Sequence, residues 1–267
     1  MATTESSAGL RLVREPCVYL LGRQTVDLEA LNDFLKDHDV SWETDTEVGG
    51  EQLIEVGGRI CYMSFGAARR RKTNADYIHH ILEVGHGSVL EHAVWNFAIT
   101  GVSRSFTHEL IRHRAGFGYS QLSQRFVDES TCDFVEPDCI ADDPELHAIW
   151  EQAIRRSHEA YVVLAQKLAG KFEGVEDRTL RRKLARQAAR SVLPNATETK
   201  IFVTANARAL RHFIEMRASE HAETEIRKVA IAMLRVLKRE APNVFGDYSL
   251  ESLDDGTEAA STNFRKV

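Results

Sequence analysis

Long apolar runs, cysteines and prolines are all scarce in this chain of 267 residues. No run of about 18 apolar residues is present, which excludes a membrane-spanning helix. The segment from Met1 to Leu10 has no basic stretch followed by an apolar one, so we expect no secretory signal and a cytoplasmic protein. The cysteines at positions 17, 61, 132 and 139 show neither C-x-x-C pairing nor metal-ligand spacing. They suit a reducing compartment, and we expect no metal site.

An excess of positive charge is also missing, since the formal net charge is −6. Because phosphate contacts dominate nucleic-acid affinity, this charge disfavours a general polyanion binder, and we expect neither a nucleic-acid nor a membrane partner. Arginines nevertheless cluster locally, and focused guanidinium groups suit a small anion such as a nucleotide or a cofactor. The clusters are 69–71, Arg104 with Arg112 and Arg114, and Arg181, Arg182, Arg186 and Arg190.

Hydrophobic periodicity predicts a mixture of helices and strands, and a single α+β domain over 1–267 is the simplest organisation. We expect the first 14 residues and 250–267 to be tails. Predicted strands cover 16–21, 93–99 and 197–204. Predicted helices cover 28–38 with Asp27 as its cap, 52–61, 74–84 with Asn74 as its cap, 105–113, 145–171 after the Asp143-Pro144 turn, 178–192, 207–217 and 223–239.

The segment from Arg112 to Arg125 has the densest set of chemically useful side chains. Its two glycines, Gly116 and Gly118, permit sharp or left-handed turns. Beyond them, alternation predicts an extended segment with Ser123 and Arg125 on one side. Permanent cations held this close together favour an anion between them. A helix C-terminus would account for the arginines at 112 and 114, but not for the polar run that follows.

This segment resembles the signature of the flavin-dependent thymidylate synthases, Arg-His-Arg followed by seven residues and a serine. Here eight residues, 115–122, precede Ser123, and we place the extra one in the 115–118 turn, where an insertion costs little. Two further segments resemble the family in the same order. They are Gly85 to His92, similar to a His-x4-Glu-His element, and three pieces of the last third, 189–194, 206–208 and 216–222. The resemblance covers about Val56 to Phe245.

His86, Glu91 and His92 would also fit a metal-dependent hydrolase, or histidines buried for structural reasons. The helical His-x3-His spacing of a metal site is absent from this segment, which disfavours a metal. A third alternative is a non-catalytic protein that binds nucleotides or RNA through its arginines. Neither the hydrolase nor the binding protein explains three ordered motifs.

The resemblance implies a role for each matching position. Arg112, Ser123, Arg125 and Arg190 would hold the nucleotide phosphate, with Arg190 coming from a neighbouring subunit. Glu109, Gln121, Leu122, Gln124 and Arg217 would complete the substrate site, with Arg217 and Ser123 closest to the chemistry. The flavin would contact Ser64, His86, Glu91, Arg112, His113, Arg114, Ser120, Asn206, Arg208, His212 and His221. Two positions depart from the family: His212 replaces a frequent asparagine, and Glu109 a common glutamine.

The implied reaction is a reductive methylation of uracil C5 that needs no cysteine nucleophile. Arg217 would stabilise the anionic ring, since a fixed guanidinium favours developing negative charge. NADPH would reduce FAD, 5,10-methylenetetrahydrofolate would donate the carbon, and dUMP would become dTMP, with UMP as the alternative substrate. The family's architecture implies a central, mostly antiparallel sheet flanked by long helices. It also implies a homotetramer whose active sites are shared between subunits.

Overall fold

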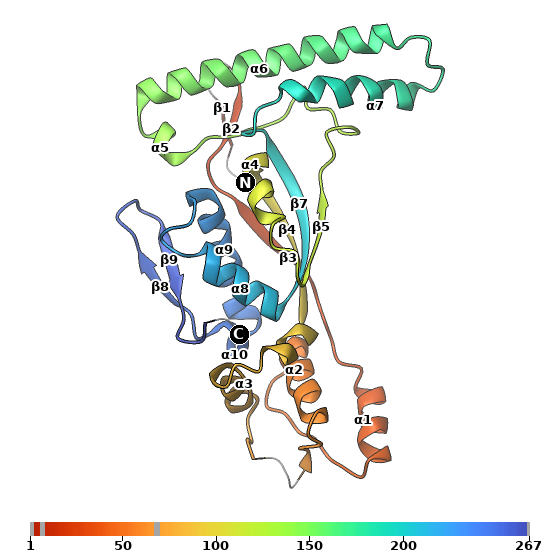
Figure 1. Ribbon diagram of the computed structural model, residues 1–267, viewed down its shortest axis with the longest axis vertical. Coiled ribbons are helices and arrows are strands. Elements are labelled where there is room, and N and C mark those ends of the chain that lie inside the picture. Colours follow the sequence, from red (N-terminus) through yellow and green to blue (C-terminus); the bar gives the residue numbers. More distant parts are fainter. Residues whose placement is uncertain (1–2, 6–8, 67–69, 266–267) are drawn as a thin grey trace. The chain divides into compact units, whose positions relative to one another are not determined.

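The computed structural model describes residues 3–5, 9–66 and 70–265. It shows a mixed α/β fold with two compact units (Figure 1). Unit 1 comprises Met1–Cys17, Ile99–Ile111 and Ser120–Ile201, and unit 2 comprises Val18–Ala98, Arg112–Tyr119 and Phe202–Val267. Among the described residues, no helix has both the length and the apolar content that crossing a membrane requires.

A four-stranded sheet contains β3 (Cys17–Arg23), β4 (Val94–Ser103), β7 (Glu198–Asn206) and β5 (Phe117–Gln121) in the order β3-β4-β7-β5. The amide of Asn206 donates to Gly116 O at 3.1 Å, and that of Leu122 donates to Lys200 O at 2.9 Å, so β5 and β7 are antiparallel. Along β4, Trp95, Phe97 and Ile99 are buried and alternate with less buried residues, as expected where one face of a strand packs on the core.

Unit 1 contains a small sheet, β1 (Thr3–Glu5), β2 (Arg11–Val13) and β6 (Phe134–Val135), in which β2 pairs in parallel with β6. Its helices are α4 (Arg104–Leu110), α5 (Asp138–Ala141), α6 (Pro144–Lys171), α7 (Arg178–Ala189) and the 3₁₀ turn η3 (Arg190–Val192). Helices α6 and α7 lie side by side as a helical hairpin (Figure 1). The predicted start of α6 is confirmed, because Asp143 accepts hydrogen bonds from the amides of Glu145 and Leu146.

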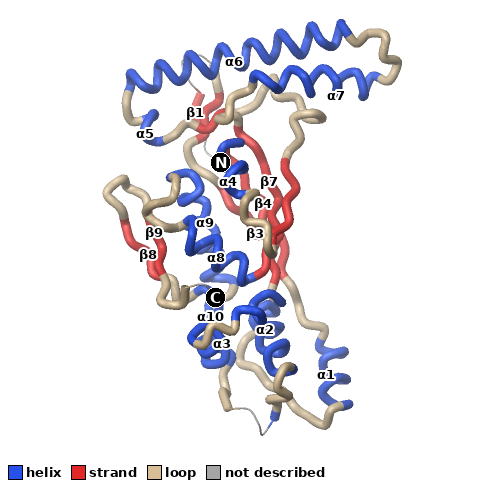
Figure 2. Tube along the Cα trace, viewed as in Figure 1, coloured by secondary structure: helices blue, strands red, loops and turns tan. Residues whose placement is uncertain are grey.

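Unit 2 contains α1 (Leu28–Asp37), α2 (Gly49–Ile60), α3 (Asn74–Glu83), the 3₁₀ helix η2 (Gly87–His92), α8 (Ala207–Arg217), α9 (Thr224–Glu240) and α10 (Pro242–Phe245). It ends in an antiparallel hairpin of β8 (Ser249–Ser252) and β9 (Glu258–Ser261). Helices α8 and α9 pack against each other (Figure 2). Phe213 and Leu234 are fully buried, and Trp95 contacts Phe245 edge to face at 5.8 Å.

The structure differs from the sequence expectations at several chain segments. Helix α4 ends at Leu110, not at residue 113, so Arg112 lies in the turn that follows. Thr73 caps α3 by accepting from the Asp76 amide, whereas Asn74 is buried and donates to the Glu55 carboxylate. The described parts of both expected tails are folded into β1, β2, β8 and β9. Short apolar runs such as Leu12 with Val13 are stabilised when buried, which explains the folded N-terminal part.

Candidate active site

The turn between α4 and β5 depends on Gly116. Its φ is +73°, a left-handed conformation that side chains disfavour. A Cβ there would lie 2.7 Å from Asn206 Nδ2 and 2.8 Å from Ala209 Cβ. Glycine therefore allows the 112–119 segment to approach the start of α8, as the sequence predicted for a turn at this point.

His113 and Arg217 form the centre of the candidate site. Arg217, the last residue of α8, donates from Nε to His113 Nε2 at 3.0 Å. Nε2 must therefore be unprotonated to accept this bond. Burial, the Arg217 charge and then His212 together lower the pKa of His113 to about 4. His113 is thus a neutral acceptor near neutral pH, and it orients the guanidinium of Arg217.

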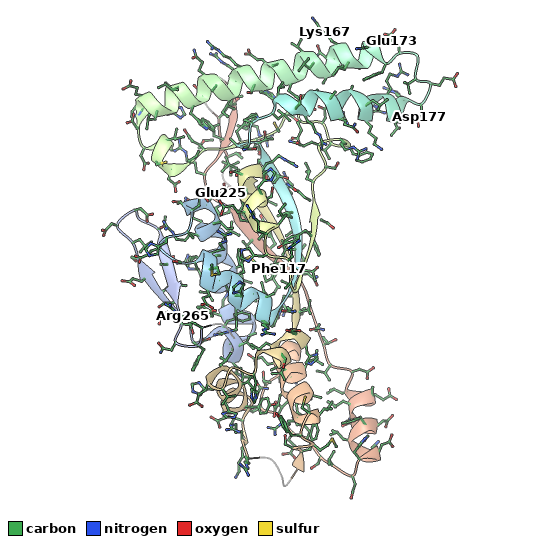
Figure 3. The ribbon with its side chains drawn as sticks, in the orientation of Figure 1. Phe117, Lys167, Glu173, Asp177, Glu225 and Arg265 are labelled. Carbon is green, nitrogen blue, oxygen red and sulfur yellow. The ribbon has the colours of Figure 1, made fainter. Side chains whose placement is uncertain are left out.

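Aromatic rings hold His113 in place. Its ring meets Phe213 edge to face at 5.1 Å and lies 6.0 Å from the ring of Phe117. Phe117, labelled in Figure 3, also contacts Phe213 and stacks on Tyr119 at 5.7 Å. The Tyr119 hydroxyl donates to the backbone carbonyl of His113, and burial raises the pKa of this tyrosine. The sequence did not predict these contacts of His113, although Phe213 lies in the apolar pattern of the predicted 207–217 helix.

A pocket of about 400 Å³ opens beside this centre. Two of its lining residues, Arg112 and Arg114, are exposed, and within the part of the chain that the structure describes neither has an ion-pair partner. Two cations and a neutral imidazole in its lining suit an anionic, partly aromatic ligand. The lining residues are Arg112, His113, Arg114, Ala115, Phe117, Ala209 and His212.

The structure brings together some of the other residues that we expected around the flavin. Arg208 donates from Nη1 to Glu91 at 2.6 Å, so two of them form an exposed ion pair. Asn206 caps α8 through a bond from the Ala209 amide. His212 lines the pocket with His113, and their ring centroids are 6.1 Å apart.

The structure also places three more of the residues that we expected around the flavin. His86 is exposed at the start of η2, and His221 is an exposed residue just beyond α8. Ser64 is half-buried, and its carbonyl accepts from the buried Arg59 at 2.9 Å. Because His86 and His92 are both exposed, the alternative of histidines buried for structural reasons does not hold. No three His, Cys, Asp or Glu side chains among the described residues gather into a metal site.

The expected phosphate segment in unit 1 is a turn and not a strand. Strand β5 ends at Gln121, and the Ser123 carbonyl accepts from the amides of Phe126 and Val127 at 3.1 and 2.9 Å. The expectation that Ser123 and Arg125 share one side of an extended segment is therefore wrong. This tight turn instead bends the chain immediately after Ser123.

Several polar groups of this segment are buried in unit 1. Gln121 donates to Thr107 Oγ1 at 3.1 Å, so its amide faces the protein. Gln124 is buried, and Arg125 Nε is buried without a hydrogen-bond partner among the described residues. Ser120 is exposed, while Glu109, Leu122 and Arg190 are half-buried, Arg190 in η3. A buried polar atom without a hydrogen-bond partner costs free energy, and a bound ligand would supply that partner.

None of the four cysteines lies in the pocket beside His113. Burial raises the pKa of Cys132, and neighbouring Glu129 and Asp133 raise it further. Cys61 is exposed at the end of α2 and donates from Sγ to the Gly57 carbonyl. A buried or merely exposed thiol without a cationic neighbour makes a poor nucleophile.

A pocket with two exposed arginines and a neutral imidazole, next to a guanidinium that this imidazole orients, can accommodate an anionic ligand. The model of the family described as "Thymidylate synthase complementing protein" matches residues 44–243. Flavin-dependent thymidylate synthases of Mycobacteroides abscessus and Mycobacterium sp. are 56% and 57% identical to this chain, over 88% and 89% of it and 94% of each relative. The chain therefore belongs to the flavin-dependent thymidylate synthase family and is a methyltransferase.

The fold has solved counterparts. The UMP/dUMP methylase PolB of Streptomyces cacaoi, in structures bound with 5-Br dUMP and with 5-Br UMP, matches with a TM-score of 0.62 and 20% identity. With 5-Br dUMP the match covers 88% of this chain and 95% of that protein. At this identity the likeness establishes the fold alone.

Proposed function

We propose that this enzyme converts dUMP to dTMP by reductive methylation at C5, with 5,10-methylenetetrahydrofolate as the carbon donor and FAD reduced by NADPH. The observation that carries the proposal is the Arg217 guanidinium, held by the neutral His113 at 3.0 Å beside a pocket with exposed arginines. Membership of the family supports this reaction. The arginines of the site support the stabilisation of negative charge that the reaction requires.

The pocket residues fit a flavin dinucleotide by their chemistry. Arg112 and Arg114 can form charge-assisted bonds with a diphosphate, and Phe117 and His212 add aromatic rings to the pocket lining. Arg208, exposed beside Glu91, and the exposed His86 and His221 would bind its remaining polar groups. Ser64, Ser120 and Asn206 would contribute further contacts. When bound, the flavin supplies the reducing equivalents that turn the transferred carbon into a methyl group.

Arg217 would act on the pyrimidine. Uracil C5 is a weak nucleophile until negative charge accumulates in the ring, and a guanidinium placed at the ring stabilises that charge. Arg217 stays protonated throughout the accessible pH range, so it cannot quench the ring anion by giving up a proton. His113 fixes the direction of the Arg217 Nε–H bond, and with it the plane of the guanidinium that would face the ring.

The nucleotide phosphate would be held by Arg112, Ser123, Arg125 and Arg190, since guanidinium forks and a hydroxyl match its oxygens. The buried Arg125 Nε, which has no hydrogen-bond partner among the described residues, supports a ligand at this turn. Arg190 would come from a neighbouring subunit of a homotetramer whose active sites are shared. Glu109, Gln121 and Leu122 would line the remainder, and the chain would work as one functional domain in the cytoplasm.

The test is turnover of 5-tritiated dUMP by purified protein reconstituted with FAD, under anaerobic conditions with NADPH and methylenetetrahydrofolate. We expect tritium release with formation of dTMP, both lost when FAD is withheld. The same assay with UMP tests the ribonucleotide alternative, for which Glu109 in place of glutamine is the motivating departure. Protein that binds no flavin, or releases no tritium from either substrate, would refute the proposal.

A further inference from the structure

The C-terminal hairpin of unit 2 lies next to the residues that carry the proposed chemistry. Helix α8 ends at Arg217, and the following loop contains His221 before α9 begins at Thr224. The hairpin strands β8 and β9 occupy 249–252 and 258–261, beyond the residues 44–243 that match the family model. On the proposed function, Arg217 and His221 contact substrate and flavin. What holds this loop therefore bears on catalysis.

Arg227 of α9 connects the loop to the hairpin turn. Arg227 is only 3% exposed, so its guanidinium depends on protein groups for its hydrogen bonds. Nη1 donates to the carbonyl oxygens of Glu220 and Ala222, at 2.7 and 3.3 Å. Nη2 donates to the Asp255 carboxylate and to Thr257 Oγ1, the latter at 2.8 Å. One side chain thus binds two loop carbonyls at one end and the hairpin turn at the other.

A second connection is made by the backbone. The amide of Ala260 in β9 donates to the carbonyl of Ala218, the residue after Arg217, at 2.7 Å. The last carbonyls of a helix lack partners within the helix, so this bond completes the end of α8. In the turn that presents Asp255, Gly256 has φ +76°. The amide of Leu253 donates to the carbonyl of Thr257 at 2.8 Å and closes this turn.

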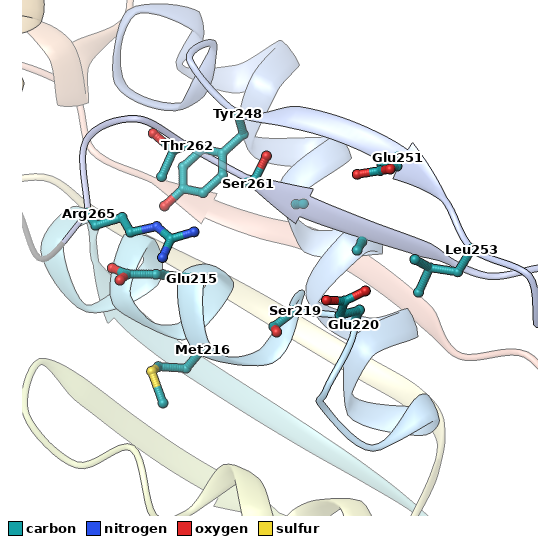
Figure 4. A pocket seen from close by; sticks show the side chains of 12 residues that line it. Glu215, Met216, Ser219, Glu220, Tyr248, Glu251, Leu253, Ser261, Thr262 and Arg265 are labelled. Carbon is teal, nitrogen blue, oxygen red and sulfur yellow. The ribbon is translucent and has the colours of Figure 1, made fainter.

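Part of this loop does not pack directly against the hairpin. A pocket of about 330 Å³ lies between them. Ser219 and Glu220 line its loop side, and Glu251 and Leu253 line its hairpin side (Figure 4). Across this space, hydrogen bonds connect the loop to the hairpin. Among the described residues, the bonds of Arg227 and of the Ala260 amide make this connection.

We infer that the C-terminal hairpin is a brace that sets the position of Arg217 and His221, and that Arg227 is a positioning residue for catalysis. A misplacement of about 1 Å at a reacting group can cost about a hundredfold in rate. An interaction made mainly in the transition state is lost from kcat and kcat/KM together, with little change in KM. Loosening the brace should therefore lower kcat more than it raises the KM for the nucleotide.

The test compares three variants of the full-length, FAD-loaded enzyme. Arg227→Gln removes the connection at its centre, and the double variant Asp255→Ala with Thr257→Val removes only its hairpin end. The matched control is Arg235→Gln, because Arg235 also joins α9 to the hairpin, through Glu258, without touching the loop. The double variant keeps the proposal testable if the buried Arg227 is required for folding.

We expect kcat to fall about tenfold or more in the double variant, with the nucleotide KM changed by less than about threefold. Hydrogen exchange at 218–222 should accelerate in that variant and stay at the wild-type rate in Arg235→Gln. Wild-type kcat and exchange in the double variant would overturn the brace. Hydrogen exchange can be measured without turnover. If the wild type is inactive but exchange at 218–222 still accelerates in the double variant, the proposed function is refuted and the brace is supported.

Discussion

Replacing Arg217 with glutamine should raise the pKa of His113 by about one pH unit. Unit charges about 4 Å apart interact by about 4 kcal/mol at an effective dielectric constant of about 20. His113 is half-exposed, and solvent screening reduces this to about 1–2 kcal/mol, or about one pH unit. Burial is the largest cause of the low pKa of about 4 and remains after the substitution, so the new value should stay below 6.5.

The assay is a pH titration of imidazole NMR signals, with His113 assigned among the 11 histidines by its loss in His113→Gln. Arg208→Gln is the matched control, because Arg208 is a cation of the same helix that pairs with Glu91 and not with His113. An unchanged His113 titration in Arg217→Gln would refute the coupling. So would an equal rise in the Arg208 control.

The same shift predicts how stability depends on pH. Between pH 6.5 and about 4, His113 binds a proton in the unfolded chain but not in the folded one. The unfolded state therefore binds more protons, and the free energy of unfolding should fall as the pH falls through this range. In Arg217→Gln the fall should be smaller. Urea unfolding at several pH values measures both.

Three further predictions concern stability and the cysteines. Gly116 and Gly85 both have positive φ, but a Cβ would clash only at Gly116. Gly116→Ala should therefore destabilise the protein by about 2 kcal/mol more than Gly85→Ala. Equal urea midpoints for the two variants would contradict this. Asp247→Asn should cost about 3 kcal/mol by leaving buried Arg211 without its carboxylate. Burial raises the pKa of Asp247, but the Arg211 bonds outweigh it, so this stabilisation is present above pH 3.8 and is lost as the pH falls through the lowered pKa. Replacing all four cysteines with alanine should leave turnover within about threefold, and a loss of a hundredfold or so would identify a thiol nucleophile.

The sequence alone predicted the long helices and the glycine turn at 115–118, because both depend on local signals. The periodic apolar residues of 145–171 and the Asp143 cap define α6 without any distant contact. The glycine of the 115–118 turn was likewise predicted from its conformational freedom, and Gly116 confirms it.

Features that depend on distant partners were not predictable in this way. The Arg217–His113 bond joins residues 104 positions apart, and nothing in either segment specifies the pair. The β8–β9 hairpin was expected to be a tail, since its exposed, polar sequence resembles one. It is held by the buried Arg227, which binds its turn, and by its own Ala260 amide, which donates to the Ala218 carbonyl; these partners meet only in the tertiary structure.

The proposed methylation of the pyrimidine depends on positive charge and a bound flavin, without a thiol. A single turnover of protein whose FAD has been reduced by NADPH, mixed anaerobically with dUMP and methylenetetrahydrofolate, tests this dependence. We expect one dTMP for each flavin oxidised, and almost none from Arg217→Gln under the same conditions. Formation of dTMP by flavin-free protein, or an undiminished yield from Arg217→Gln, would contradict it.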